Sequence, residues 1–129
     1  MKFNIKFGLP FVSIELIFRG KVLLLEKVLL DTGSASTILN ANRLEIIGVV
    51  PEEYDVVDAI RGVGGIEYVY TKQLDQLKLD QTILENFQVE IGNMDYGFDL
   101  DGIIGFDFIS DAELVIDTKQ SIVYSAKPL

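Results

Sequence analysis

The sequence predicts an all-β fold, a small closed or sandwich-like β-structure, and three observations lead to it. Short apolar segments are separated by turn residues at a spacing of about 8–12 residues, which is typical of β-sandwiches and β-barrels. Several segments alternate apolar and polar residues, as strands with one buried face do. Apolar residues also make up 49% of the chain, too large a share for a disordered polypeptide. We expect a single domain over residues 1–129.

The first half of the chain predicts strands followed by a short helix. Strand patterns occupy four segments: residues 3–7, 11–18, 22–30 and 36–39. The apolar residues on one face of the second segment are Val12, Ile14, Leu16 and Phe18. Arg19-Gly20-Lys21 predicts a hairpin turn between the second and third segments. A short helix is expected over Asn40–Ile47, because Asn40 or Asn42 can cap its start and Gly48 can end it.

The second half predicts further strands and one helical turn. Strand patterns occupy five segments: residues 56–60, 66–79, 84–91, 114–116 and 122–124. The first two flank a glycine cluster, as the two arms of a hairpin do. The last two form a closing hairpin around Asp117-Thr118-Lys119-Gln120, and residues 106–110 predict one turn of helix.

Charge and composition exclude several classes of function. The chain has 20 acidic and 11 basic residues, a net charge of −9, and its basic residues are scattered, so nucleic-acid binding is not expected. No apolar stretch approaches the roughly 20 residues of a membrane helix, and the N-terminus lacks the apolar core of a signal peptide. We therefore expect a soluble, cytoplasmic protein that does not bind membranes.

Two missing residue types narrow the chemistry further. The sequence contains no Cys and no His, which removes thiol nucleophiles, His general bases, Ser-His-Asp triads and nearly all zinc sites. If the protein is an enzyme, carboxylates must carry the acid–base chemistry, with Lys, Tyr or a bound hard cation as the other options. No cofactor and no metal are expected.

Asp31-Thr32-Gly33-Ser34 is the main candidate for a catalytic segment. It follows the apolar run Val28-Leu29-Leu30, so it places a carboxylate in a loop at the exit of a buried strand. Loops held by rigid elements are where catalytic groups concentrate. The alternative is an ordinary turn, since all four residue types favour turns.

Two glycine-containing segments accompany this loop. Arg61-Gly62-Val63-Gly64-Gly65-Ile66 forms a hairpin tip that can fold over a cleft and open again, or else an ordinary turn rich in glycine. In Gly102-Ile103-Ile104-Gly105 the glycines permit close backbone approach, and both Ile side chains are expected to be buried. The alternative for this second segment is a core strand with a tight bend.

An acidic loop at Asp95, Asp99 and Asp101 invites a calcium-site interpretation. An EF-hand is excluded, because Gly97 and Phe108 would stand where that loop requires carboxylates. A looser cation site remains an alternative, but we expect these residues to form a solvated loop.

Taken together, these segments resemble the retropepsin-like aspartic proteases, the single-domain family that includes the retroviral proteases. The resemblance spans residues 11–124 and has four parts in the family's order. These are Leu29–Ser34 as the catalytic loop, Gly62–Ile66 as the flap, Ile103-Ile104-Gly105 as the apolar-apolar-Gly motif, and Phe106–Ile109 as the short helix after it.

The resemblance implies an all-β, small closed β-barrel of the acid protease type with one short helix and one flap hairpin. It implies an aspartic endopeptidase that acts on peptides as a symmetric homodimer, because the chain has one Asp-Thr-Gly and the chemistry needs two carboxylates. Asp31 of each subunit would activate a water, Thr32 would brace the two loops, and the Gly33 N–H would orient the carboxylate. The implied substrate-binding residues are Ser34, Gly62, Val63, Gly64, Gly65, Ile66, Ile103 and Ile104.

The chain also departs from the retroviral members. Phe106 stands where they carry an Arg that helps to secure the dimer, and residues 1–10 add a candidate strand. Asp107 is expected to hydrogen-bond to the loops that hold the short helix. Two other functions remain open: a non-catalytic dimerisation or peptide-binding module with the same fold, and a metal-assisted hydrolase that uses the acidic loop.

Overall fold

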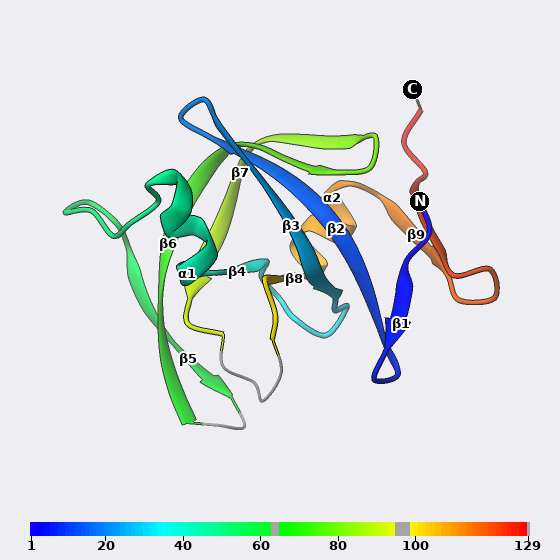
Figure 1. Cartoon of the computed structure of the whole chain (residues 1–129), viewed down its shortest axis with the longest axis horizontal. Coiled ribbons are helices and arrows are strands. Elements are labelled where there is room, and N and C mark those ends of the chain that lie inside the picture. Colours follow the sequence, from blue (N-terminus) through cyan, green and yellow to red (C-terminus); the bar gives the residue numbers. More distant parts are fainter. Residues whose placement is uncertain (63–64, 95–98, 129) are drawn as a thin grey trace.

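The computed structural model describes residues 1–62, 65–94 and 99–128 of the chain. It is mostly β, as the sequence predicts (Figure 1). The strands are β1 (Asn4–Lys6), β2 (Leu9–Phe18), β3 (Lys21–Leu30), β4 (Ile38–Asn40), β5 (Val57–Gly62), β6 (Gly65–Leu79), β7 (Thr82–Gly92), β8 (Gly102–Ile104), β9 (Leu114–Asp117) and β10 (Ile122–Ser125). The helices are α1 (Ala41–Leu44), the 3-10 helix η1 (Glu45–Ile47) and α2 (Phe106–Asp111).

The main sheet closes on itself over part of its length. Within the described residues, eight strands pair in the order β1-β2-β3-β8-β4-β7-β6-β5, and β2 also pairs with β6. This extra pairing, which sets Leu16 opposite Leu77, makes a ring of β2, β3, β8, β4, β7 and β6. The predicted all-β fold of the acid protease type is thus confirmed.

The β9–β10 hairpin lies outside this ring. In Figure 1 it stands at the side of the molecule where the N-terminus also lies. Residue Lys2 forms an antiparallel bridge with Ile122 on β10, so the start of the chain extends the hairpin.

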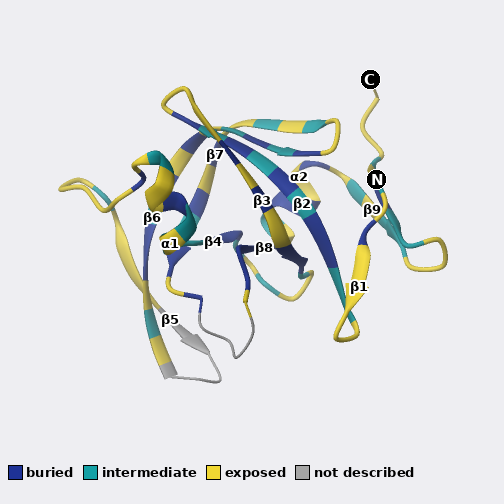
Figure 2. Ribbon diagram, viewed as in Figure 1, coloured by how far each residue is buried: buried dark blue, intermediate teal, exposed yellow. Residues whose placement is uncertain are grey.

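Two apolar clusters occupy the two faces of the sheet. The larger one contains the predicted face of β2, with Val12, Ile14, Leu16 and Phe18 all buried, and Figure 2 shows this burial along the strand. Phe87 and Phe108 meet there edge to face, with 5.6 Å between ring centroids. The smaller cluster consists of Phe11, Leu29, Ile38, Met94, Leu100 and Ile103.

The predicted hairpin turn after β2 and the predicted ends of the helical segment are both confirmed. Arg19 and Gly20 both have positive φ, 49° and 81°, and make the two-residue turn between β2 and β3. Such turns match the right-handed twist of paired strands. The Asn40 side chain accepts a hydrogen bond from the Asn42 N–H at the start of α1, and Gly48, with φ of 80°, ends η1.

One strand begins later than the sequence predicts. The pattern places a strand at 36–39, whereas β4 starts at Ile38. The reason is that the Thr37 N–H donates to the Asp107 carboxylate and not to a neighbouring strand, although the Thr37 carbonyl accepts from the Glu90 N–H of β7. Among the described residues, no helix combines the length and apolar content needed to cross a membrane.

Candidate active site

The Asp31 loop leaves the end of β3 and is held on the inside by β8. The Asp31 N–H donates to the carbonyl of Ile104 at 2.9 Å, which continues the parallel pairing of β3 with β8 by one residue. The Gly33 N–H donates to Asp31 Oδ1 at 2.9 Å, the contact expected from the sequence. The carboxylate is therefore fixed from within its own turn, while Thr32 and Gly33 are exposed.

β8 brings the second glycine motif against this loop. It is inserted between β3 and β4, parallel to the first and antiparallel to the second. A Cβ on Gly105 would overlap the carbonyl of Ser36 and lie 2.9 Å from the Ser34 carbonyl, so only glycine fits. The Phe106 N–H then donates to that Ser34 carbonyl at 2.7 Å. The glycines permit close backbone approach here, as the sequence predicts.

Thr37 and Asp107 lock the loop to α2. The Thr37 N–H and Oγ1 donate to the two carboxylate oxygens of Asp107, at 3.1 and 2.8 Å. The same Oγ1 accepts from the Gly105 N–H at 3.1 Å. The predicted role of Asp107 is confirmed, whereas sequence reasoning missed Thr37, which is fully buried.

The residues expected to bind substrate differ in how far they are buried. Ile103 and Ile104 are buried, with exposed fractions of 8% and 0%, so they lie behind the loop rather than on its surface. Ser34 is half-buried, and its Oγ donates to the Ser36 carbonyl.

The glycine-rich hairpin is formed by β5 and β6. Their pairing continues to Gly62 opposite Gly65, and Ile66 is 55% exposed. In Figure 1 this hairpin and the Asp31 loop both extend toward the lower edge of the molecule. Val63 and Gly64, also expected to bind substrate, lie outside the described residues.

The acidic loop is not simply solvated, which corrects the sequence expectation for one residue. Asp101 is buried. Its Oδ2 accepts hydrogen bonds from the backbone N–H groups of Glu26 and Lys27, and its Oδ1 lies 3.5 Å from the Arg43 side chain. Asp99 is exposed and pairs with Lys27 at 2.9 Å.

Two residues of the alternative cation site therefore attach the acidic loop to other elements: Asp99 and Asp101 bind β3, and Asp101 also pairs with α1. Asp95 lies outside the described residues. Within the described ranges, no three acidic side chains gather as a set of metal ligands.

A family model described as aspartyl protease matches residues 15–108, which cover most of the chain and both motifs of the loop region. The chain belongs to this aspartyl protease family, which is part of the retropepsin-like clan. No curated protein matches the chain. For a member of this family, the loop around Asp31 is the candidate active site.

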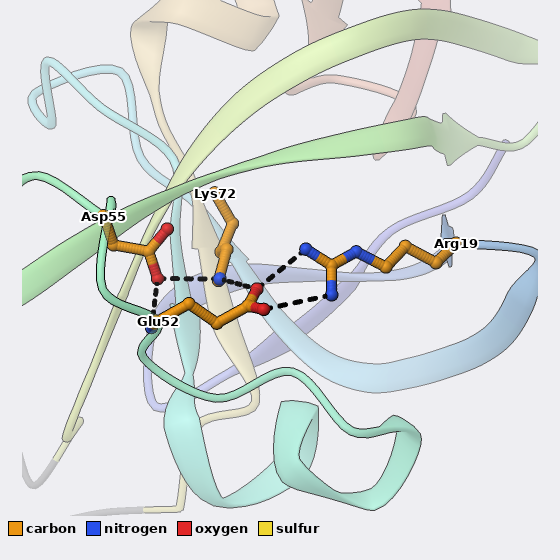
Figure 3. A network of polar contacts seen from close by, with 4 residues as sticks. All are labelled: Arg19, Glu52, Asp55 and Lys72. Carbon is orange, nitrogen blue, oxygen red and sulfur yellow. Dashed lines mark hydrogen bonds and ion pairs between the residues drawn. The ribbon is translucent and has the colours of Figure 1, made fainter.

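The root of the β5–β6 hairpin in this member of the family is fixed by a network of charges (Figure 3). Lys72 on β6 is only 5% exposed, and its Nζ lies 2.6 Å from Glu52 and 2.7 Å from Asp55. Arg19, from the β2–β3 turn, reaches the same Glu52 carboxylate at 2.7 Å. The network joins the segment before β5 to β6 and to the β2–β3 turn.

These contacts shift the pKa values of Glu52, Asp55 and Lys72. The hydrogen bonds from Arg19 and Lys72 lower the pKa of Glu52 from 4.5 to about 2. The hydrogen bond from Lys72 also lowers the pKa of Asp55. Burial opposes the charge on Lys72, but its hydrogen bonds to Asp55 and Glu52 outweigh it and raise its pKa. All three groups are therefore charged at neutral pH.

We predict that Thr37→Val lowers the free energy of unfolding by about 1–3 kcal/mol, because it leaves the buried Gly105 N–H without its acceptor. Urea denaturation measures this, with Thr118→Val in the exposed turn after β9 as the matched control. An equal, small effect of the two substitutions would contradict this role of Thr37.

We also predict that the charge network makes the protein sensitive to acid. The lowered pKa values of Glu52 and Asp55 add stability above their ordinary pKa, and this stability is lost as the pH falls from 4.5 toward 2. Lys72→Met should therefore be less stable than wild type at neutral pH and lose less stability over that range. Urea denaturation at several pH values tests this, with Lys119→Met on the surface as the control. If the free energy of unfolding falls by the same amount between pH 4.5 and pH 2 in wild type and Lys72→Met, the prediction is contradicted.

Proposed function

We propose that the protein is an aspartic endopeptidase whose active site forms between two copies of the chain. The observation that carries this proposal is the Asp31 carboxylate, oriented by the Gly33 N–H in a loop that β8 and Thr37 hold in place. One chain supplies one such carboxylate, and hydrolysis by this route needs two. A symmetric dimer supplies the second from an identical loop.

The surface around the loop supports this arrangement. Thr32 and Gly33 are exposed in the single chain, where they are available to contact the same loop of a second copy. Phe106, directly after the Gly105 that packs against the loop, is 52% exposed. An exposed aromatic side chain at this position favours an apolar dimer contact in place of the ionic one made by the retroviral Arg.

The two Asp31 carboxyls would share one proton, because like charges about 3 Å apart cannot both ionise easily. The ionised carboxylate takes a proton from a water, and the water oxygen bonds to the peptide carbonyl carbon. The protonated carboxyl donates its proton to the carbonyl oxygen. Collapse of the tetrahedral intermediate then breaks the C–N bond: the leaving nitrogen takes the proton that the first carboxylate received from the water, and a hydroxyl of the intermediate returns a proton to the second carboxylate.

The β5–β6 hairpin would act as the flap in this mechanism. It would cover the extended peptide, exclude water and contribute backbone groups to the substrate. The Lys72 network supports this role, because it fixes the hairpin at its root, where Lys72 of β6 pairs with Glu52 and Asp55.

We expect Asp31→Asn to abolish cleavage of a diverse peptide library, with a loss of at least about a hundredfold, because Asn cannot transfer the proton. The chain offers a matched control in Asp117→Asn, which changes the other Asp-Thr pair, where Lys119 replaces the glycine. Purified wild type and both variants are compared from acidic to neutral pH. Equal turnover by Asp31→Asn, or binding of peptides by wild type without any cleavage, would overturn the proposal.

A further inference from the structure

Glu90 on β7 has a carboxylate oxygen without a partner. Its Oε2 is shielded from solvent and accepts no hydrogen bond from the described residues. Buried carboxylates are normally paired or hydrogen-bonded, since removing a charge from water without compensation is costly. A buried, unpartnered oxygen is therefore a position at which a donor from another molecule would be favourable.

The pairing of strands places Glu90 in a row that crosses the sheet. Residues directly opposite one another on neighbouring strands share a face of the sheet. From β3 through β8, β4 and β7 to β6, the residues in register are Leu29, Ile103, Ile38, Glu90 and Thr71.

This row faces away from the main core. The neighbours of Glu90 on β7, Val89 and Ile91, belong to the larger apolar cluster, so Glu90 points to the opposite face. The three apolar members of the row belong to the smaller cluster instead. The row is thus apolar at the β3 end and polar at Glu90 and Thr71.

The same row links the two parts of the candidate active site. Leu29 lies two residues before Asp31 on β3, and Thr71 lies on the β6 arm of the hairpin, five residues after Ile66. The row therefore runs from the base of the catalytic loop to the root of the hairpin. The three apolar members of the row are buried, whereas Glu90 and Thr71 are half-buried, so a peptide held between loop and hairpin would meet the row at its polar end.

The basic side chain nearest in sequence to Thr71 is not available to Glu90. Lys72 pairs in register with Val89, so it lies on the other face, and it is already bound to Glu52 and Asp55. The whole chain also has a net charge of −9, which attracts cationic peptides and repels acidic ones.

We propose that Glu90 selects the substrate by binding a Lys or Arg side chain close to the cleaved bond. This inference rests on the proposed protease function. In a symmetric dimer each subunit presents one Glu90, so basic side chains are favoured on both sides of the cleaved bond. The charge-assisted hydrogen bond to Oε2 supplies the selectivity.

The test compares pairs of peptides that differ only at one position, with Lys or Arg in one and norleucine or citrulline in the other. For each enzyme, the ratio of kcat/KM for the basic peptide to that for the neutral peptide is measured. We expect wild type to prefer the basic peptide and Glu90→Gln to lower this ratio at least tenfold. The matched control is Glu85→Gln, which removes the same charge from an exposed position on the same strand and should leave the ratio unchanged.

A ratio taken on one enzyme sample does not depend on how much of that sample is folded, so a loss of stability cannot imitate the expected result. If wild type cleaves peptides but shows no preference for basic ones, or if Glu90→Gln keeps the preference, this inference is overturned and the protease function stands. If wild type cleaves no peptide, the proposed function fails and this inference fails with it.

Discussion

A single buried threonine joins the segments on which the candidate active site depends. Thr37 donates to both oxygens of Asp107, accepts from the Gly105 N–H, and offers its own carbonyl to the Glu90 N–H at 2.9 Å. These bonds tie the Asp31 loop to the end of β8, to α2 and to β7. Because Thr37 is fully buried and its bond with the Gly105 N–H lies in the interior, water cannot easily replace that bond. The position of the Asp31 carboxylate follows from this junction.

The same junction bears on the proposed dimer. The loop is rigid on its inner side, where Gly105 leaves room for the backbone of Ser34 and Ser36 and nothing larger. Its outer side, at Thr32 and Gly33, is exposed. A symmetric dimer contact uses the same surface of both copies. A loop that is held on its inner side and exposed on its outer side can present that surface in the same geometry from each copy. In the proposed dimer, the net charge of −9 on each chain would favour the approach of cationic peptides over acidic ones.

Local sequence patterns were sufficient to predict the strands and the short motifs, but they did not predict the order in which the strands pair. Alternation identified β2 and its buried face, the glycine motifs were found from their residue types, and the role of Asp107 was implied by the resemblance to the retropepsin-like proteases. The insertion of β8 between β3 and β4 was not predictable, because strand order depends on contacts between distant segments. Thr37, Lys72 and Glu90 were missed for a related reason: the Thr37–Asp107 bond joins residues 70 positions apart. A polar contact of that kind leaves no periodic signal in the sequence.

The central claim is that two copies of the chain together form one active site. The most direct measurement is peptidase activity per mole of chain across a dilution series, with sedimentation equilibrium on the same samples to give the fraction of dimer. If each subunit supplies one Asp31, activity per chain should fall in proportion to the dimer fraction. Full activity in samples that sediment as monomers would contradict the account.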